Sequence, residues 1–582
     1  MKKLFTFQEN IRSSELMMTL RSLRHDFMWV IFFSLIANLL TLTPTIYMLQ
    51  LYDRVLASQS EMTLLFLTII VLIFFLVTAF AEGLRSRLLV RIGIKMDRKL
   101  NARVFHASFA SHLSQEQKNA GEHFNHLTSV RQFLTGNGII ALCDVPWTPI
   151  YIMVIFFLHP LLGWLSIGFA LIQIGIAFYS QHVTHQKDEG ARVSEQKNRS
   201  FLFNKIRNAE TVEAMGMLGH LKKHWLKYHR DKQHKIKVSF TKIQEQKALG
   251  KLVRYSMQSF TLGAAALLVI EGNLSPGAMI AANILMSKAL QPLDLIVGSW
   301  KSFIEAKKSF YSIDGLLKTF SEEDHDVNYP EPQGKISLKN LVATSPNRND
   351  PILKNLSVAF DKGQVTAVIG PSGSGKSTLA RCLLGLWPHM EGLVLLDKTP
   401  ITNWSKDQLG PHIGYLPQDV ELLDGTFAEN IGRFYEMDAE KIVAAAKQAG
   451  IHEMILKFPQ GYDTMIGESG NLLSGGQRQR VALARAIYGE PKIVILDEPN
   501  ANLDEVGERS LVEAIQHLKK KGASIFLITH RLNILQITDH ILRMKDGMIE
   551  GYGERDEMLN AIKNEAGHQN HTEPRSNNST LH

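Results

Sequence analysis

Cysteine is almost missing from this sequence, in which Cys143 and Cys382 are the only two among 582 residues. Two distant cysteines do not make a disulfide framework, so the soluble part of the chain is expected to lie in a reducing compartment. A basic stripe with interleaved aromatic residues is missing as well, although the formal charge is +8. Lysine and arginine crowd two segments between apolar runs, 85–103 and 222–251, and this distribution does not favour a nucleic acid partner.

A cleavable signal peptide is also missing. The N-terminal residues are basic but turn polar before an apolar core develops. The first long apolar run starts near Phe27, exceeds the length of a signal-peptide core and lacks a cleavage pattern. We therefore expect this run to be retained as a membrane span.

The first half of the chain is rich in long apolar runs, each close to the roughly twenty residues with which a helix crosses a bilayer. The expected spans are 27–49, 62–81, 139–158, 161–179, 253–270 and 278–297. Two long connectors, 82–138 and 180–252, are polar but carry apolar residues at helical spacing. The pattern predicts an all-α, six-helix membrane domain at 27–320, whose helices continue beyond the membrane.

The second half alternates short apolar strands with polar helical stretches, as soluble α/β domains do. An acidic, proline-bearing linker at 321–334 leads into it. The soluble domain is expected at 335–563, and the polar tail at 564–582 is expected to be disordered.

A buried-strand pattern, Val365 to Gly370, runs directly into a glycine-rich loop. In this context the loop predicts a phosphate cradle, because its glycines let backbone N–H groups converge on an anion. Lys376 would reach the β- and γ-phosphate oxygens, and Ser377 would offer its hydroxyl to Mg²⁺. The predicted phosphate-binding residues are Gly370, Pro371, Ser372, Gly373, Ser374, Gly375, Lys376, Ser377 and Thr378.

A second apolar strand ends in two acids, Asp497 and Glu498. Asp497 suits the Mg²⁺ shell beside Ser377, and Glu498 suits a general base that polarises the attacking water. Gln418 can sense Mg²⁺ and the γ-phosphate through its amide, and His530, after another buried strand, can contact the γ-phosphate from the far side. The candidate catalytic residues are therefore Glu498, His530 and Gln418, and the candidate Mg²⁺ ligands are Ser377, Gln418 and Asp497.

A second anion site is predicted where L-S-G-G-Q opens a helix. Its hydroxyl and glycine N–H groups lie at the positive end of a helix dipole. The loop at 370–378 is already expected to hold the phosphates of a nucleotide bound by the same domain. The residues of this second motif are Leu473, Ser474, Gly475, Gly476 and Gln477.

With these motifs in this order, the soluble half resembles the nucleotide-binding domain of ABC transporters over about 335–558. In that family two domains enclose two ATP molecules head to tail, so the resemblance implies that Leu473 to Gln477 act on ATP bound to a second copy. It further implies that Asp504 serves communication across that interface and that Glu468 lies in the contact loop of exporters. The implied fold is a membrane all-α six-helix exporter domain followed by an α/β P-loop NTPase domain.

The family's usual adenine-stacking aromatic is missing, since there is no Phe, Tyr or Trp between Glu331 and Ala359. Its expected place is around Thr344 to Pro346. We expect aliphatic contact to hold adenine instead, which concerns base selectivity rather than hydrolysis. The catalytic set is complete, so both sites of a homodimer are expected to be active.

Five stretches of the membrane half narrow the resemblance to the type I secretion ATPases that export proteases, lipases and related unfolded polypeptides. They are 48–56, 143–151, 157–163, 207–218 and 276–293. The segment 1–26 is too short for the cysteine-peptidase domain of leader-cleaving exporters, which disfavours bacteriocin export. The alternative is a small-molecule or lipid exporter, which shares every ATPase residue named above.

That resemblance implies a homodimeric inner-membrane protein that uses ATP and Mg²⁺. Its implied partners are a periplasmic membrane-fusion protein, a TolC-like outer-membrane channel, a polypeptide cargo with a C-terminal secretion signal, and membrane lipid. Because ATP lies in the cytosol and six spans return the chain to its starting side, both termini are expected to be cytoplasmic.

Polar residues in the membrane half have two interpretations each. Asp53 and Arg54, at the outer end of the first span, form either a gating ion pair or an interfacial anchor. Asp144, beside Pro146, either lines a polar path or caps a proline-kinked helix end.

The connector at 180–252 contains a glycine-interrupted stretch, 207–218, which is either a docking surface for the ATPase domain or a plain hairpin tip. His220 and His224 are spaced i, i+4 on a helical pattern, but two ligands are too few and their basic neighbours repel cations. No metal is therefore expected there.

Overall fold

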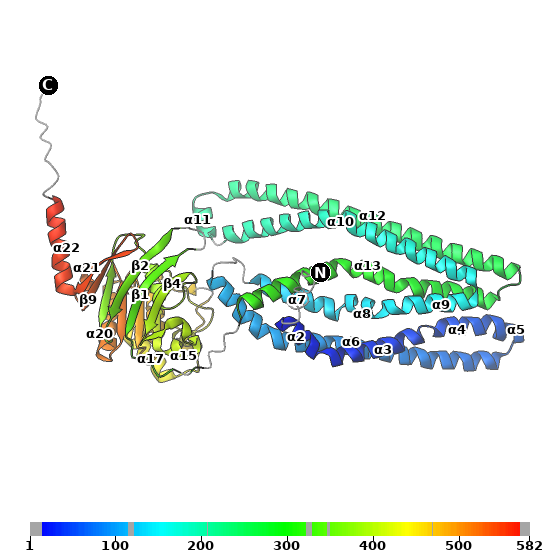
Figure 1. Cartoon of the computed structure of the whole chain (residues 1–582), viewed down its shortest axis with the longest axis horizontal. Coiled ribbons are helices and arrows are strands. Elements are labelled where there is room, and N and C mark those ends of the chain that lie inside the picture. Colours follow the sequence, from blue (N-terminus) through cyan, green and yellow to red (C-terminus); the bar gives the residue numbers. More distant parts are fainter. Residues whose placement is uncertain are drawn as a thin grey trace, which may run out of the picture. The chain divides into compact units, whose positions relative to one another are not determined.

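The structure is a computed structural model that describes residues 14–114, 121–206, 208–321, 327, 329–345, 350–467 and 470–570. The chain divides into two compact units, one formed by residues 1–109 and 119–321 and the other by residues 110–118 and 322–582. The first is helical and the second contains both sheets of the chain's described part (Figure 1).

The first unit consists of long helices, several of which continue well past the expected spans (Figure 1). Its elements are α2 (Glu15–Ser22), α3 (Arg24–Leu40), α4 (Thr43–Gln50), the π-helical turn η1 (Leu51–Val55), α5 (Leu56–Ser58), α6 (Glu61–Leu113), α7 (Gly121–Thr135), α8 (Asn137–Asp144), the 3₁₀ turn η2 (Val145–Trp147), α9 (Thr148–Leu158), α10 (Pro160–Ile206), α11 (Ala209–Ala214), α12 (Leu218–Ile270) and α13 (Pro276–Thr319).

Five helical stretches of the described residues are long and apolar enough to cross a membrane. They are Arg24–Ser58, Glu61–Leu113, Gly121–Leu158, Leu218–Ile270 and Pro276–Thr319, and Pro160–Ile176 is a shorter apolar stretch. Each expected span falls within one of these six stretches or, for 161–179, within α10. Large apolar side chains such as Phe66 and Leu76 are 63% and 71% exposed, as side chains that face lipid would be.

Proline interrupts the first and third stretches. Pro44 lies in the first turn of α4, and Pro146 lies in η2 between α8 and α9. Proline has no backbone N–H, so it frees a carbonyl of the preceding turn and breaks the helical ladder. In a membrane such breaks are tolerated where other groups satisfy the backbone, and a polar cluster lies beside both of them.

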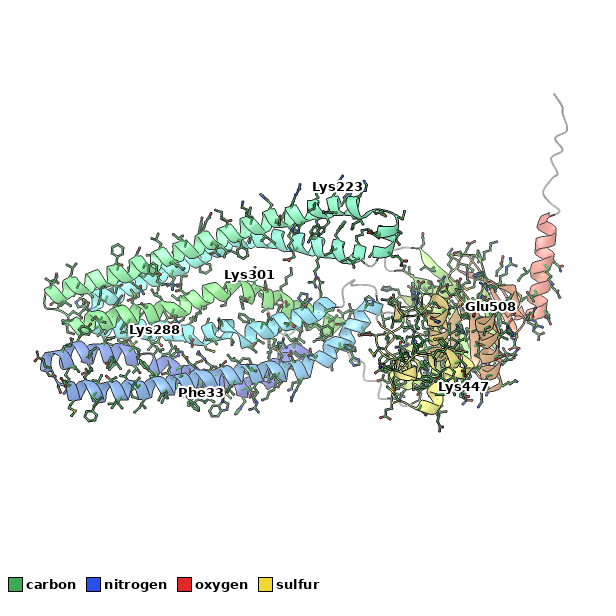
Figure 2. The ribbon with its side chains drawn as sticks, turned by 180° about the vertical axis from the view of Figure 1, so that it is seen from behind. Phe33, Lys223, Lys288, Lys301, Lys447 and Glu508 are labelled. Carbon is green, nitrogen blue, oxygen red and sulfur yellow. The ribbon has the colours of Figure 1, made fainter. Side chains whose placement is uncertain are left out.

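The two long helices α10 and α12 run side by side and are joined through α11 (Figure 1). The stretch 208–218 is therefore the tip of a helical hairpin, and Met215 and Leu218 expose 70% and 58% of their surface there. Lys223 projects outward from α12 near this tip (Figure 2). Among the described residues no group of three or more histidine, cysteine, aspartate or glutamate side chains is placed to hold a metal ion.

Asp53 caps a helix, a role that neither sequence-based alternative included. Its Oδ1 accepts a hydrogen bond from the Gly277 N–H at 2.8 Å, and its Oδ2 accepts one from the Ser275 hydroxyl at 2.5 Å. These groups begin α13, with Pro276 at the first helical position. A negative charge at a helix N-terminus is favourable, so Asp53 fixes the connector after the first span onto α13.

The second unit contains two sheets. The antiparallel sheet has the order β2 (Pro351–Phe360), β1 (Ile336–Thr344), β4 (Met390–Leu396), β5 (Thr399–Pro400). The larger sheet has the order β10 (Met548–Glu554), β9 (His540–Lys545), β3 (Val365–Ile369), β8 (Ser524–Ile528), β7 (Ile493–Asp497), β6 (Ile413–Leu416). All its pairings are parallel except that of β10 with β9.

Helices and short 3₁₀ turns connect these strands. They are α14 (Lys376–Leu383), η3 (Ile401–Asn403), α15 (Lys406–Leu409), η4 (Gly410–His412), α16 (Phe427–Ile431), α17 (Ala439–Gln448), α18 (His452–Ile455), η5 (Gly461–Asp463), α19 (Gly475–Ile487), α20 (Glu505–Lys520), α21 (Leu532–Leu535) and α22 (Arg555–Asn570). α22 continues past residue 563, and residues 571–582 of the expected tail lie outside the described residues.

The parallel strands place the candidate site. Every residue of β7 and β8 is buried, as expected for apolar strands covered on both faces. β3, β8 and β7 are adjacent and parallel, so their carboxyl ends meet at one edge of the sheet. Ligands of open α/β sheets bind at that edge, and all three strands end there in a predicted site residue or loop.

Candidate functional site

The predicted phosphate loop, residues 370–378, connects β3 to α14. Gly370 has a φ of +153°, and a Cβ on it would lie 2.2 Å from the Met544 carbonyl oxygen. Gly375 has a φ of +94° and is the N-cap of α14, and a Cβ there would lie 2.7 Å from the Leu353 side chain. Both positions therefore require glycine, and the conformation they permit turns the loop back over the start of the helix.

The Lys376 side chain folds back so that its ammonium group lies against this loop. Its Nζ donates to the carbonyl oxygens of Gly370 at 2.9 Å and of Pro371 at 2.8 Å. The ammonium group thus lies beside the loop backbone, where a phosphate chain would follow the N-terminus of α14.

Asp497, the last residue of β7, is only 2% exposed. Burial raises the pKa of its carboxyl group, and a hydrogen bond from Ser377, the next-largest influence, lowers it. Its Oδ1 is buried and has no hydrogen-bond partner among the described residues. A buried carboxylate oxygen beside a serine hydroxyl is a donor set that suits a hard divalent cation.

The three candidate catalytic side chains come together. Gln418, just after β6, donates from Nε2 to Glu498 Oε2 at 3.3 Å. His530, just after β8, places Nδ1 3.7 Å from Glu498 Oε1. Glu498 is 25% exposed and His530 67%, so both side chains stand at the open edge of the sheet where water has access.

The backbone of Glu498 is unusual. Its φ is +49°, a left-handed conformation that non-glycine residues rarely adopt. Its N–H donates to the Ile528 carbonyl oxygen at the end of β8 at 3.0 Å, and its own carbonyl accepts from the Ala501 N–H at 3.1 Å. Residues held in such conformations cluster at active sites, because the surrounding fold must enforce them.

The L-S-G-G-Q motif begins α19 as predicted. Ser474 is the N-cap and accepts from the Gln477 N–H at 3.3 Å, and the Gln477 side chain accepts from the Ser474 N–H at 2.8 Å. Gly475 and Gly476 occupy the first two helical positions, whose N–H groups have no acceptor within the helix. This arrangement leaves those donors at the positive end of the helix, where an anion can bind.

Two residues, Asp504 and Glu468, were predicted to lie at the interface with a second copy of the chain. Asp504 is the N-cap of α20 and accepts from the Gly507 N–H at 2.9 Å, a role within its own domain. Glu468 lies outside the described residues.

Sequence reasoning gave no role to two side chains near the site. Trp387, beyond α14, donates from Nε1 to the Thr344 carbonyl oxygen at 2.9 Å, so an aromatic residue holds the end of β1 where the family's adenine-stacking aromatic was expected. Gln479 of α19 is buried and bonds the backbone that follows β7. Both contacts join residues far apart in the chain, and no local pattern marks them.

The Cys382 thiol on α14 provides a test of the packing behind the loop. It is 0% exposed, and burial raises its pKa to about 12. At pH 8 only about one thiol in 10⁴ is then a reactive thiolate. In a Cys143→Ser variant, maleimide should leave the native protein unlabelled at pH 8 and label it stoichiometrically after unfolding in detergent. Rapid labelling of the native protein would contradict this packing.

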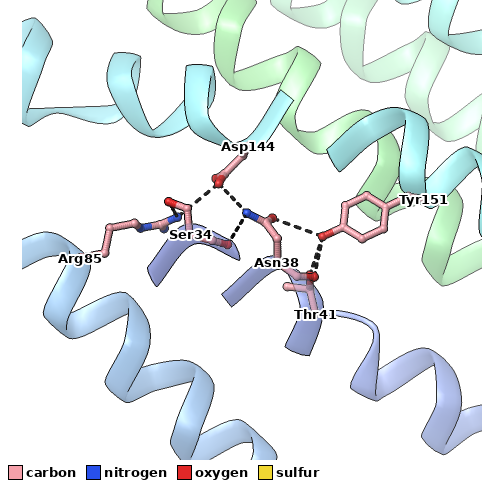
Figure 3. Close-up of polar contacts among 6 residues, drawn as sticks. All are labelled: Ser34, Asn38, Thr41, Arg85, Asp144 and Tyr151. Atoms are coloured by element: carbon pink, nitrogen blue, oxygen red, sulfur yellow. Dashed lines mark hydrogen bonds and ion pairs between the residues drawn. The ribbon is translucent and has the colours of Figure 1, made fainter. Parts of the chain in front are cut away.

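A polar cluster joins α3, α6 and α8 in the membrane unit (Figure 3). Asp144 Oδ1 accepts from Asn38 Nδ2 at 2.7 Å and from an Arg85 guanidinium nitrogen at 3.3 Å. That nitrogen of Arg85 also lies 3.3 Å from the Ser34 hydroxyl. The Arg85 and Asp144 side chains are only 12% and 13% exposed, so the ion pair is largely removed from solvent.

The cluster continues from Asn38 toward α9. The Tyr151 hydroxyl donates to the Asn38 carbonyl oxygen at 2.8 Å and lies 2.7 Å from the Thr41 hydroxyl, at the break between α3 and α4 (Figure 3). Asp144 therefore bonds to neighbouring helices rather than capping its own helix end. The 143–151 stretch supplies both Asp144 and Tyr151, which fix the broken third span to the first.

Asp144, Arg85 and Asn38 bring together a carboxylate, a guanidinium group and a side-chain amide, and a second set of these three groups lies elsewhere in the membrane unit. Asp294 of α13 is paired with Arg254 of α12 and accepts from the Gln173 amide of α10. The membrane unit thus contains two aspartates that each contact one arginine and one amide, with the three groups on three different helices. The Arg254 and Asp294 side chains are 49% and 31% exposed, so this pair is more open to its surroundings than Arg85 and Asp144 and stabilises the helix contacts less.

Models of two known families match the chain. The model described as the ABC transporter transmembrane region matches residues 27–293, and the model described as ABC transporter matches residues 353–501. The second match contains the phosphate loop, the L-S-G-G-Q motif and Glu498.

Relatives match over nearly the whole chain. A type I secretion system ATP-binding protein, PrsD, of Rhizobium meliloti (strain 1021) is 38% identical over 95% of each chain. The leukotoxin export ATP-binding protein LtxB of Aggregatibacter actinomycetemcomitans is 29% identical, over 92% of this chain and 76% of that protein. The toxin RTX-I translocation ATP-binding protein of Actinobacillus pleuropneumoniae is 28% identical over the same shares of the two chains.

A solved structure has the same fold. It is that of a bacterial Atm1-family ABC exporter with ATP bound, with a TM-score of 0.79 and 22% sequence identity, covering 95% of this chain and 99% of that chain. This likeness concerns the fold alone. The expected order of a helical exporter domain and an α/β nucleotide-binding domain is confirmed by it and by the two family models.

Proposed function

This chain belongs to the ABC transporter family, among the ATP-binding proteins of type I secretion systems, and on that premise we propose that it exports an unfolded polypeptide across the inner membrane. It couples ATP hydrolysis to this export. The observation that carries the proposal is the 38% identity over 95% of both chains, because it includes the membrane half, where exporters of different cargo differ. The proposed cargo is a protease, lipase or RTX-type protein with a C-terminal secretion signal.

The geometry of the ATPase unit supports hydrolysis. Glu498 would take the proton of the attacking water, since its carboxylate stands at the open edge of the sheet between Gln418 and His530. Gln418 and His530 would orient that water and the γ-phosphate around the carboxylate. Lys376, whose Nζ lies over the phosphate loop, would stabilise the charge on the phosphates.

Ser377 and Asp497, with Gln418, would hold the Mg²⁺ that accompanies ATP. The orphaned, buried Oδ1 of Asp497 supports this assignment. A bound Mg²⁺ neutralises negative charge on the β- and γ-phosphates. Asp497 itself would stay a carboxylate there, because a neighbouring cation opposes the effect of burial on its pKa.

The working form is proposed to be a homodimer with two composite sites. The exposed N-terminus of α19 supports this, because Ser474, Gly475 and Gly476 offer an anion site in addition to the phosphate loop. ATP would join the two copies, and hydrolysis would release them. Asp504 and Glu468 are proposed to lie at that interface, and the 207–218 tip is proposed to dock on an ATPase domain through its exposed apolar residues.

The chain is a multi-pass membrane protein. Both termini are proposed to be cytoplasmic. The C-terminal ATPase domain must reach cytosolic ATP, and six spans would place the N-terminus on the same side of the membrane. The proposed partners are a periplasmic membrane-fusion protein, a TolC-like outer-membrane channel and the surrounding lipid. Export of a small molecule or lipid is not favoured, because the similar secretion proteins are named for secretion systems and protein toxins.

The test is secretion by a strain that lacks this chain. The culture medium should lose at least one protein, and plasmid-borne wild-type protein should restore it. The Glu498→Gln variant serves as the matched control, because it should reach the membrane at the same level without restoring secretion. An unchanged set of secreted proteins in the deletion strain, under conditions where the chain is expressed in the wild type, would contradict the proposal.

A further inference from the structure

Gln479 is a fully buried polar residue beside the catalytic segment. It lies on α19, two residues past the L-S-G-G-Q motif, and is only 1% exposed. Its Nε2 donates to the Pro499 carbonyl oxygen at 3.0 Å and lies 3.4 Å from the Glu498 carbonyl oxygen. A buried amide in such a position requires partners, and Gln479 finds them in the peptide that carries Glu498.

That peptide needs external support. Glu498 has a left-handed backbone, with a φ of +49°, although it precedes proline, where extended backbone is preferred. The end of β8 supports it from one side through the Ile528 carbonyl oxygen. Gln479 supports it from the side of α19 by holding the next carbonyl oxygen in the chain.

The start of α19 is packed against the continuation of the same segment. A Cβ on Gly476 would lie 2.7 Å from the Asn502 carbonyl oxygen, so the start of the helix closely approaches the backbone of Asn502, four residues after Glu498. A shift of the α19 N-terminus would therefore be passed to this segment. Gln479 is the side chain through which the shift would act on the peptide next to Glu498.

We propose that Gln479 is a positioning residue. It orients the Glu498 carboxylate according to whether the N-terminus of α19, the L-S-G-G-Q helix, is bound to ATP. When the N-terminus of α19 binds the γ-phosphate of ATP held by the second copy, Gln479 aligns Glu498 for hydrolysis in its own site. The inference rests on the proposed function, because it requires composite sites in a homodimer. It links the two sites within each chain, from the helix that serves one ATP to the base that hydrolyses the other.

The experiment uses the full-length dimer in nanodiscs and the variant Gln479→Met, which keeps the side-chain volume and removes the donor. The variant should lower kcat by 10- to 100-fold, leave the ATP concentration for half-maximal binding within two-fold, and bring the Hill coefficient for hydrolysis down to 1. The matched control is Arg480→Met. Arg480 is the next residue on α19 and contacts the Gly450 carbonyl oxygen, away from Glu498, so this variant should stay within two-fold in kcat.

A purely structural role would look different. It would lower the unfolding temperature and ATP binding together with kcat, and that result would overturn the proposal, as would a Gln479→Met variant with wild-type kcat and cooperativity. If Gln479→Met does not fold, Gln479→Glu keeps the length and replaces the donor with an acceptor, and the same outcomes apply. Failure of the proposed function is separate, because then the wild-type dimer itself would hydrolyse ATP without cooperativity or not at all.

Discussion

The Glu498→Gln variant should bind ATP like the wild type and hydrolyse it about 10²- to 10⁴-fold more slowly, the usual contribution of a general base. Glutamine keeps the size and the hydrogen-bond reach of glutamate but cannot accept the water proton. The phosphates are held elsewhere, by the 370–378 loop and Lys376, so the affinity for ATP should not fall. Phosphate release and equilibrium binding of labelled ATP, measured on the same purified protein, separate the two effects.

The matched control is Glu513→Gln, the same change at an exposed position of α20. This variant should hydrolyse ATP at the wild-type rate, which excludes a general effect of removing one negative charge. Normal hydrolysis by Glu498→Gln would exclude Glu498 as the base. Loss of ATP binding together with hydrolysis would instead indicate that the variant disturbs the strained backbone at this position.

The second large effect is expected from the polar cluster of the membrane unit. Replacing Arg85 with Met leaves the Asp144 carboxylate largely buried without its counter-charge, and breaking a buried pair in this way costs about 3–5 kcal/mol. Asp144 is also the last residue of α8, where the helix dipole already disfavours a negative charge. Denaturation of the purified protein in detergent should therefore show a clearly lower free energy of unfolding for Arg85→Met.

The double variant Arg85→Met with Asp144→Leu separates the cost of an unpaired charge from the value of the pair. It removes both charges, so it should recover most of the lost stability. Arg87→Met is the matched control, because Arg87 is an exposed arginine two positions along α6 and its replacement should have little effect. A double variant as unstable as Arg85→Met would show that the pair itself, rather than the unpaired carboxylate, determines the stability.

The phosphate loop, the acids after β7 and the start of α19 could be predicted because each depends on local geometry. Gly370 and Gly375 adopt conformations that other residues avoid, and Ser474 and Gln477 cap the helix on which they lie. The convergence of Gln418, Glu498 and His530 was also predictable. They follow β6, β7 and β8, which are neighbouring parallel strands, and the strands of a parallel sheet end at the same edge.

The partners of the buried polar residues could not be predicted. Asp144 meets Asn38, 106 positions earlier, and Asp53 meets Ser275, 222 positions later. The only partners that the sequence suggested for these aspartates were their neighbours, Arg54 for Asp53 and the helix end beside Pro146 for Asp144. For Gln479, nothing in the sequence indicated that its side chain is buried or that it contacts the backbone next to Glu498.

The sequence by itself thus determined the chemistry of this protein, since phosphate binding, helix capping and membrane insertion depend on short segments and their intrinsic preferences. Only the tertiary structure decided which helices the aspartates hold together and which strained peptide Gln479 supports. The physical reason is that a buried polar group takes whichever complementary group the packing brings within about 3 Å. That choice depends on the arrangement of the whole fold, and no local pattern contains it.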